Sequence, residues 1–106
     1  MVGIDIVEVG RIKGIISKKG ARFLYKILSE EEINYVSRKK RFVESVSGIF
    51  AAKEAFMKAM EKRLPFKKIR VFHQNGKPYI IYENKKYGDV SISHEKNYAV
   101  SVVIIP

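Results

Sequence analysis

The feature that most constrains the fold is a long, mostly apolar segment near the middle of the chain. The periodicity of residues 42–62 predicts a long helix, and Pro65 marks its end. One stripe of this helix is apolar and rich in alanine: Ala52, Ala55, Phe56, Ala59 and Met60. Because alanine side chains are small, another element of the fold can approach the helix closely along this stripe.

Shorter elements are expected on either side. Residues 2–7, VGIDIV, are predicted to form a strand with Val2, Ile4 and Ile6 on one face. Short helices are predicted over residues 8–18, 21–28 and 29–37, and the last begins at a capping box, SEEEI.

The part of the chain after Pro65 is predicted to be β-structure. IRVFH and YIIYE flank Asn75-Gly76, a pair typical of hairpin turns, and DVSISHE and YAVSVVII form a second strand pair. The last strand is nearly all apolar, so we expect both of its faces to be covered. The whole predicts a single α+β domain over residues 1–106, with helices, one of them long, packed on a small antiparallel sheet.

Charge and composition restrict the function. The chain has 21 Lys and Arg against 11 Asp and Glu, a net charge of +10, which implies an acidic partner: nucleic acid, an anionic membrane, a phosphorylated metabolite or an acidic protein. Zinc–thiolate sites and disulfides are excluded because there is no cysteine. Any metal would be a hard cation held by carboxylates and phosphate, in practice Mg²⁺ or Mn²⁺. Without a long apolar span or signal peptide, a cytoplasmic location with no membrane partner is expected.

Three charged residues lie in unusually apolar surroundings. Asp5 interrupts a predicted strand, and Glu54 and Lys58 project from one side of the long helix. Two carboxylates with a neighbouring lysine can anchor Mg²⁺ and neutralise a phosphate. The alternative is an ordinary ion pair between Glu54 and Lys58, of little energetic consequence. His94 shares an apolar face, which is also typical of a half-buried structural histidine.

These residues also belong to recognisable motifs. VGID at 2–5 and FAAKEAFMKA at 50–59, at this separation, resemble the paired signature of the 4′-phosphopantetheinyl transferase superfamily. The QNGKPY hairpin and the terminal VSISHEKNYAVSVVI are similar to its small bacterial branch, the holo-[acyl-carrier-protein] synthases. The resemblance implies a role in lipid and fatty acid biosynthesis. It also implies transfer of the 4′-phosphopantetheine group of coenzyme A to a serine of apo acyl carrier protein, with release of adenosine 3′,5′-bisphosphate.

The resemblance implies roles for particular residues. Asp5 and Glu54 would bind Mg²⁺, with Glu54 also orienting the base, and Lys58 would contact phosphate or act as an acid. The coenzyme A positions would be Asn75, Gly76, Lys77, Pro78, Ser93 and His94. Contacts to the acidic carrier protein would come from Arg11, with Lys13, Lys18 and Arg22 as weaker candidates. A homotrimer with sites between subunits is also implied.

The chain departs from the family pattern in two places. Ile49 stands where an arginine is common, and MEKRLPF replaces a glycine-rich stretch, where Lys62 or Arg63 are candidate substitutes as phosphate contacts. Two other functions remain to be distinguished from transfer. A basic nucleic-acid-binding module would explain the charge but not the acids in apolar surroundings, so no nucleic-acid partner is expected. An inactive trimeric scaffold would bind coenzyme A without transfer.

Overall fold

The computed structural model describes residues 1–106 and confirms an α+β fold. Its elements, in chain order, are β1 (Val2–Glu8), α1 (Val9–Lys19), α2 (Ala21–Ile27), α3 (Glu30–Ser37), α4 (Phe42–Met60), the 3₁₀ helix η1 (Phe66–Lys68), β2 (Arg70–Gln74), β3 (Lys77–Tyr82), β4 (Lys85–Tyr87), β5 (Val90–His94) and β6 (Tyr98–Ile104). No helix is long and apolar enough to cross a membrane.

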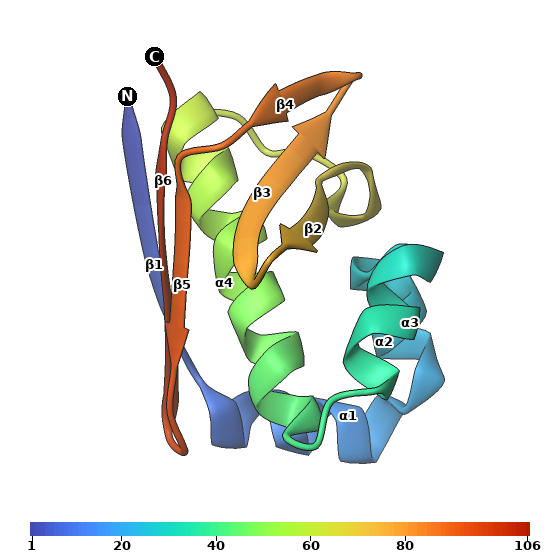
Figure 1. The fold of residues 1–106 in the computed structure, drawn as a ribbon. Helices are drawn as coiled ribbons and strands as arrows, with labels where there is room; N and C mark the ends of the chain where they lie inside the picture. The colour runs from blue at the N-terminus through green and yellow to red at the C-terminus, as the bar shows by residue number, and fades with distance from the viewer.

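The strands form two antiparallel sheets rather than the single sheet expected. One has the order β1-β6-β5 and the other β2-β3-β4. Helix α4 runs between them, and α1, α2 and α3 gather at the end of the molecule where α4 begins (Figure 1). Strand β4 was not predicted, because its three residues, Lys85–Tyr87, are too short and polar to show a pattern.

The alanine stripe of α4 packs against β1 as expected. Gly3 is buried, and a Cβ atom there would lie 2.7 Å from Ala59 N and would also collide with the carbonyl of Ala55. The two backbones therefore touch at this point. Since alternate strand residues share a face, Asp5 is directed to the same side of β1 as Gly3, towards α4. The close approach thus brings a strand carboxylate beside the long helix.

The helix boundaries follow local chemistry. In the predicted capping box, Ser29 Oγ accepts from the Glu32 amide and the Glu32 carboxylate accepts from the Ser29 amide. Helix α4 ends at Met60, slightly earlier than predicted, because Glu61 adopts a left-handed conformation with φ of 58°. Residues 61–65 then turn the chain back towards η1.

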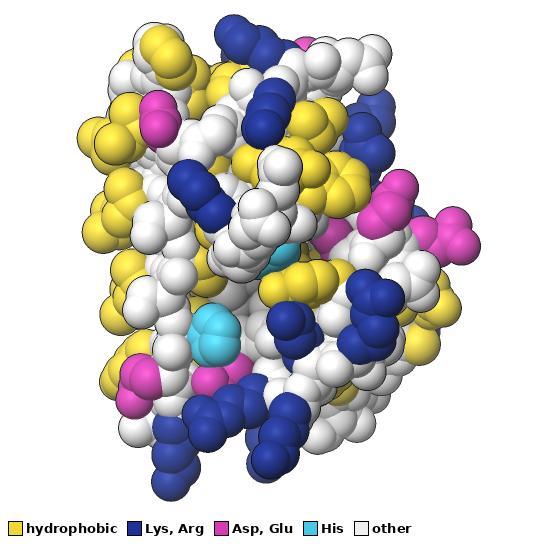
Figure 2. Space-filling view, in the orientation of Figure 1, with side chains coloured by type: hydrophobic (Ala, Val, Ile, Leu, Met, Phe, Trp, Pro, Cys, Tyr) yellow, Lys and Arg dark blue, Asp and Glu magenta, His cyan; other side chains and the backbone are white.

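One face of the first sheet is apolar and uncovered within this chain. Its side chains include Val2, Ile4, Ile6 and Ile104, which are between 50% and 65% exposed. In Figure 2 they belong to the hydrophobic side chains gathered along the left edge, over β1 and β6. The expectation that both faces of the last strand are covered is therefore wrong for a single chain: α4 covers one face, while Ile104 on the other is exposed.

Candidate active site

Asp5 and Lys58 meet across the junction of β1 and α4. Lys58 Nζ lies 3.2 Å from Asp5 Oδ1 and donates to the carbonyl oxygen of Ile4 at 2.9 Å. Asp5 therefore lies beside the long helix. Lys58 does not form the ordinary ion pair with Glu54 that helical spacing allows, since its acidic partner comes from the strand.

Burial and the neighbouring charges change the pKa of Asp5. Burial raises the pKa of this carboxyl, while the hydrogen bond and charge of Lys58 lower it. The charge of Glu54 raises the same pKa and that of Arg11 lowers it. Glu54 and Arg11 are therefore within electrostatic range of Asp5. The fold places Asp5 against Lys58, which lies one turn of α4 from Glu54.

Glu54 forms an ion pair beside the predicted metal position. Its side chain is 20% exposed, and its Oε1 atom lies 3.3 Å from Arg63 Nη2. Oε1 is buried and accepts no hydrogen bond, so it meets this guanidinium at ion-pair distance only. The buried carboxylate oxygen therefore faces positive charge, which a bound metal cation would also supply. Although no group of three or more metal-ligating side chains is present, Mg²⁺ needs only one or two protein carboxylates.

A basic cleft of about 550 Å³ opens beside Glu54. Its basic lining residues are Arg11, Lys18, Lys19, Arg22, Lys26 and Arg63. Its apolar lining residues are Ile15, Phe23, Ile27, Phe50 and Phe66. The cleft therefore combines cations at its walls with an apolar surface and one carboxylate.

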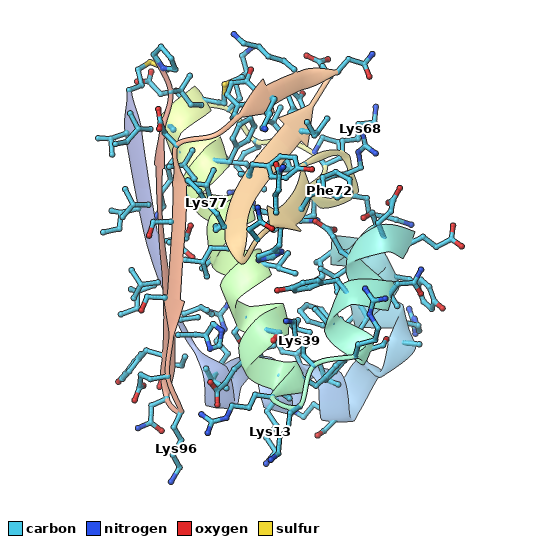
Figure 3. The ribbon with its side chains drawn as sticks, viewed as in Figure 1. Lys13, Lys39, Lys68, Phe72, Lys77 and Lys96 are labelled. Atoms are coloured by element: carbon cyan, nitrogen blue, oxygen red, sulfur yellow. The ribbon has the colours of Figure 1, made fainter.

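The predicted carrier-protein contacts are only partly in this cleft. Arg11, Lys18 and Arg22 line it, but Lys13 does not; Figure 3 shows the Lys13 side chain extending away from the body of the molecule. Sequence reasoning missed Lys19 and Lys26, although their helical spacing from Ile15 and Arg22 was a usable signal.

The predicted coenzyme A positions on the hairpin lie elsewhere. Asn75 and Gly76 have φ of 53° and 79°, as a tight hairpin turn requires. Asn75, Lys77 and Pro78 line a hollow of about 440 Å³ that shares no residue with the basic cleft. Lys77 Nζ donates to the Gly88 carbonyl at 3.0 Å; Figure 3 labels this side chain on β3.

His94 lies in a third place. Its Nδ1 atom is 3.0 Å from Glu44 Oε1, so it has a polar partner at the start of α4. It lines a small pocket with Ile49 and His73, whereas Ser93 is exposed and points to the other face of β5. Within one chain, the structure does not bring the hairpin or His94 to the carboxylates.

The two departures from the family pattern also have defined surroundings. Ile49 is buried in the core beneath the His94 pocket, so it offers no charge there. Arg63 lines the basic cleft, while Lys62 lines a neighbouring hollow with Lys58. Arg63 therefore places a cation next to Glu54.

Comparison with known proteins identifies the family. The family model of the 4′-phosphopantetheinyl transferase superfamily matches residues 1–103. The holo-[acyl-carrier-protein] synthase of Halothermothrix orenii is 40% identical over 97% of this chain and 94% of its own length. That of Thermodesulfovibrio yellowstonii is 44% identical over 98% of this chain and 96% of its own.

Solved structures agree with these sequence relatives. The crystal structure of Helicobacter pylori holo-[acyl-carrier-protein] synthase in complex with coenzyme A superimposes with a TM-score of 0.89 at 29% identity, covering 100% of both chains. The Neisseria meningitidis synthase gives a TM-score of 0.87 at 29% identity, covering 96% of this chain and 94% of its own.

Proposed function

The chain belongs to the 4′-phosphopantetheinyl transferase superfamily as a holo-[acyl-carrier-protein] synthase, and from this premise we propose how it performs the transfer. The enzyme moves the 4′-phosphopantetheine group of coenzyme A to a serine of apo acyl carrier protein and releases adenosine 3′,5′-bisphosphate. The observation that carries the proposal is the contact of Asp5 with Lys58 one helical turn from Glu54, which lines a basic cleft.

Asp5 and Glu54 would hold Mg²⁺, or Mn²⁺ in its place. Two carboxylates that each lie beside a basic side chain, Asp5 beside Lys58 and Glu54 beside Arg63, suit a hard cation that completes its coordination with water and substrate phosphate. When bound, such an ion polarises the phosphoryl oxygens and offsets the negative charge that develops in the transfer. The Lys58 ammonium already lies beside Asp5, so positive charge is favourable at this position.

Lys58 and Glu54 have separate tasks in the proposal. The Lys58 ammonium is more than half exposed, so it can turn from Asp5 to donate to a phosphate oxygen of coenzyme A. Glu54, besides holding the metal, would orient the base that removes the proton of the serine hydroxyl.

The basic cleft would receive the acidic carrier protein. Arg11, Lys18 and Arg22 would attract it, and Phe23 and Phe50 would pack against its apolar surface next to the serine. This docking direction brings the serine towards Glu54, which lies in the same cleft.

Coenzyme A would be bound between subunits of a homotrimer. The hairpin residues and His94 do not meet the carboxylates within one chain, and an uncovered apolar sheet face is available for association. We propose that a neighbouring subunit completes the site through this face. A cytoplasmic location is part of the same proposal.

The test is intact-mass analysis of an apo carrier protein after incubation with the enzyme, coenzyme A and Mg²⁺. We expect the carrier protein to gain the mass of one phosphopantetheine group, and EDTA to prevent the gain. Coenzyme A binding without any mass gain would instead support an inactive scaffold. Tight nucleic-acid binding with a steep salt dependence and no transfer would support the basic binding module.

A further inference from the structure

The residue that precedes Glu54, Lys53, is completely buried. Its ammonium donates three hydrogen bonds, to the Ile27 carbonyl at 2.6 Å, to Glu32 Oε1 at 2.7 Å and to the Phe66 carbonyl at 2.9 Å. A lysine ammonium has three donors, so each is used. The three acceptors come from the end of α2, from α3 and from η1, while the lysine belongs to α4.

Glu32, the acidic partner in this buried pair, also has both of its carboxylate oxygens hydrogen-bonded. Glu32 has no exposed side-chain surface, and its Oε1 accepts from the Ser29 amide at 2.8 Å as well as from Lys53. Glu32 Oε2 accepts from the Val71 amide on β2 at 2.6 Å. The pair therefore connects four helices and a strand of the second sheet through directional contacts.

Such a pair is not needed for stability alone. Both side chains of the pair are fully buried, and removing an ammonium and a carboxylate from water is costly. Buried ion pairs are often no more stabilising than apolar side chains of similar volume. Apolar side chains cannot form directional hydrogen bonds. They would leave the carbonyls of Ile27 and Phe66 free to move or rotate.

The two residues that carry these carbonyls are part of the walls of the basic cleft. Ile27 and Phe66 both line it, and the ring of Phe66 stacks on Phe50 with centroids 5.3 Å apart. Glu54, which lines the same cleft, is the next residue along the helix from Lys53. One ammonium thus holds two walls of the cleft at a set distance from the helix that carries Glu54.

We propose that Lys53 and Glu32 are positioning residues that set the shape of the carrier-protein cleft. They touch neither substrate; they act through Ile27 and Phe66, which present the apolar wall to the carrier protein. The inference rests on the proposed docking of the carrier protein in this cleft. It predicts that loss of the pair weakens carrier-protein recognition more than coenzyme A recognition, independently of any loss of stability.

The test compares Lys53→Met with the neutral pair Glu32→Gln/Lys53→Met and with Ile80→Ala. The double variant avoids an uncompensated buried carboxylate, so it remains folded if Lys53→Met alone does not. Ile80 is fully buried on β3 but does not line the cleft, so its variant controls for lost stability. The melting temperature, kcat, and the KM values for carrier protein and for coenzyme A are measured for each.

We expect both Lys53 variants to raise the carrier-protein KM about tenfold and to change the coenzyme A KM by less than about twofold. Ile80→Ala should leave both KM values near those of the unmodified enzyme even where its melting temperature is equally low. The inference is overturned if the double variant has an unchanged carrier-protein KM, or if that KM simply follows the melting temperature across all variants.

Arg22→Glu, measured in parallel, separates this inference from the function on which it rests. If Arg22→Glu raises the carrier-protein KM and the double variant does not, only the positioning role is wrong. If Arg22→Glu has no effect either, the carrier protein does not dock in this cleft, and both the docking proposal and the positioning role are wrong.

Discussion

The backbone at Gly3 lies directly against the backbone of α4 at Ala59, so close that a Cβ atom on Gly3 would be 2.7 Å from Ala59 N. This contact fixes the distance between β1 and the helix, and with it the meeting of Asp5 and Lys58. A side chain at this position would push the strand away from the helix, because both neighbours are backbone and cannot move aside.

Gly3→Ala should therefore lower the free energy of unfolding by about 1–3 kcal/mol and reduce transfer activity. Gly14→Ala is the control, because a Cβ atom there meets nothing within 4 Å. As Gly14 is in helix α1, that change should raise stability by up to about 1 kcal/mol. Denaturant unfolding measures both, and equal stability of the two variants would refute the close contact.

Glu54→Ala should remove metal-dependent activity. Loss of one of the two proposed metal ligands is expected to lower kcat/KM about 100-fold or more. Glu31→Ala, which removes a half-exposed acid of α3, should retain activity. Transfer rates over a Mg²⁺ titration, and Mn²⁺ binding followed by paramagnetic resonance, measure the effect; full activity of Glu54→Ala at limiting Mg²⁺ would contradict the metal assignment.

His73 should make the stability of the protein depend on pH. Burial, and to a smaller degree the charge of Lys39, lowers the pKa of His73 from its ordinary value of 6.5. The unfolded chain therefore binds a proton more readily than the folded one, so stability is greatest above pH 6.5 and falls as the pH drops towards the folded-state pKa.

His73→Phe tests this dependence, because a phenyl ring can keep the stacking on Tyr35, whose ring is 4.2 Å away. Relative to that variant, the unmodified protein should lose unfolding free energy between about pH 7 and pH 5. Denaturant unfolding at several pH values measures the difference. A constant difference over this range would mean that His73 does not titrate in the folded protein as its surroundings require.

Arg22→Glu should weaken carrier-protein recognition, because it places a negative charge in the cleft proposed to bind an acidic protein. We expect the carrier-protein KM to rise about tenfold, with the effect shrinking at high salt. Lys13→Glu makes the same change in charge outside the cleft and should alter KM by less than about threefold. Equal effects of the two variants would show that only net charge matters.

Ile104→Asp should disrupt the proposed trimer, because it introduces a charge into the uncovered apolar face of the first sheet. Light scattering after size-exclusion chromatography is expected to show a trimer for the unmodified chain and a monomer with little transfer activity for this variant. Tyr25→Asp, on an exposed apolar residue of α2, should leave the trimer intact. An unmodified protein that is itself monomeric would contradict the proposal.

Much of the architecture was predictable because it depends on local patterns. The capping box at Ser29, the Asn75-Gly76 turn and the apolar stripe of α4 each act within a few residues, and each formed as expected. Strand β4 was missed because it has no such pattern. The division into two sheets was also missed, since strand pairing is decided between segments distant in the sequence.

The candidate site was likewise only partly predictable from the sequence. The sequence identified Asp5, Glu54 and Lys58 by their apolar surroundings and family motifs, and the fold brings Asp5 into contact with Lys58. It assigned a role in the reaction to Lys58 and none to Lys53, a lysine of the same helix. In the structure Lys53 is fully buried and Lys58 is half exposed.

The sequence by itself determined the types of the main elements, the family and the chemical groups available for the reaction. Only the tertiary structure decided which charges became partners: Lys58 with Asp5, Lys53 with Glu32, and Arg63 with Glu54. Helical spacing sets the direction of each side chain, but the partner that it meets depends on which distant segment packs against that side of the helix.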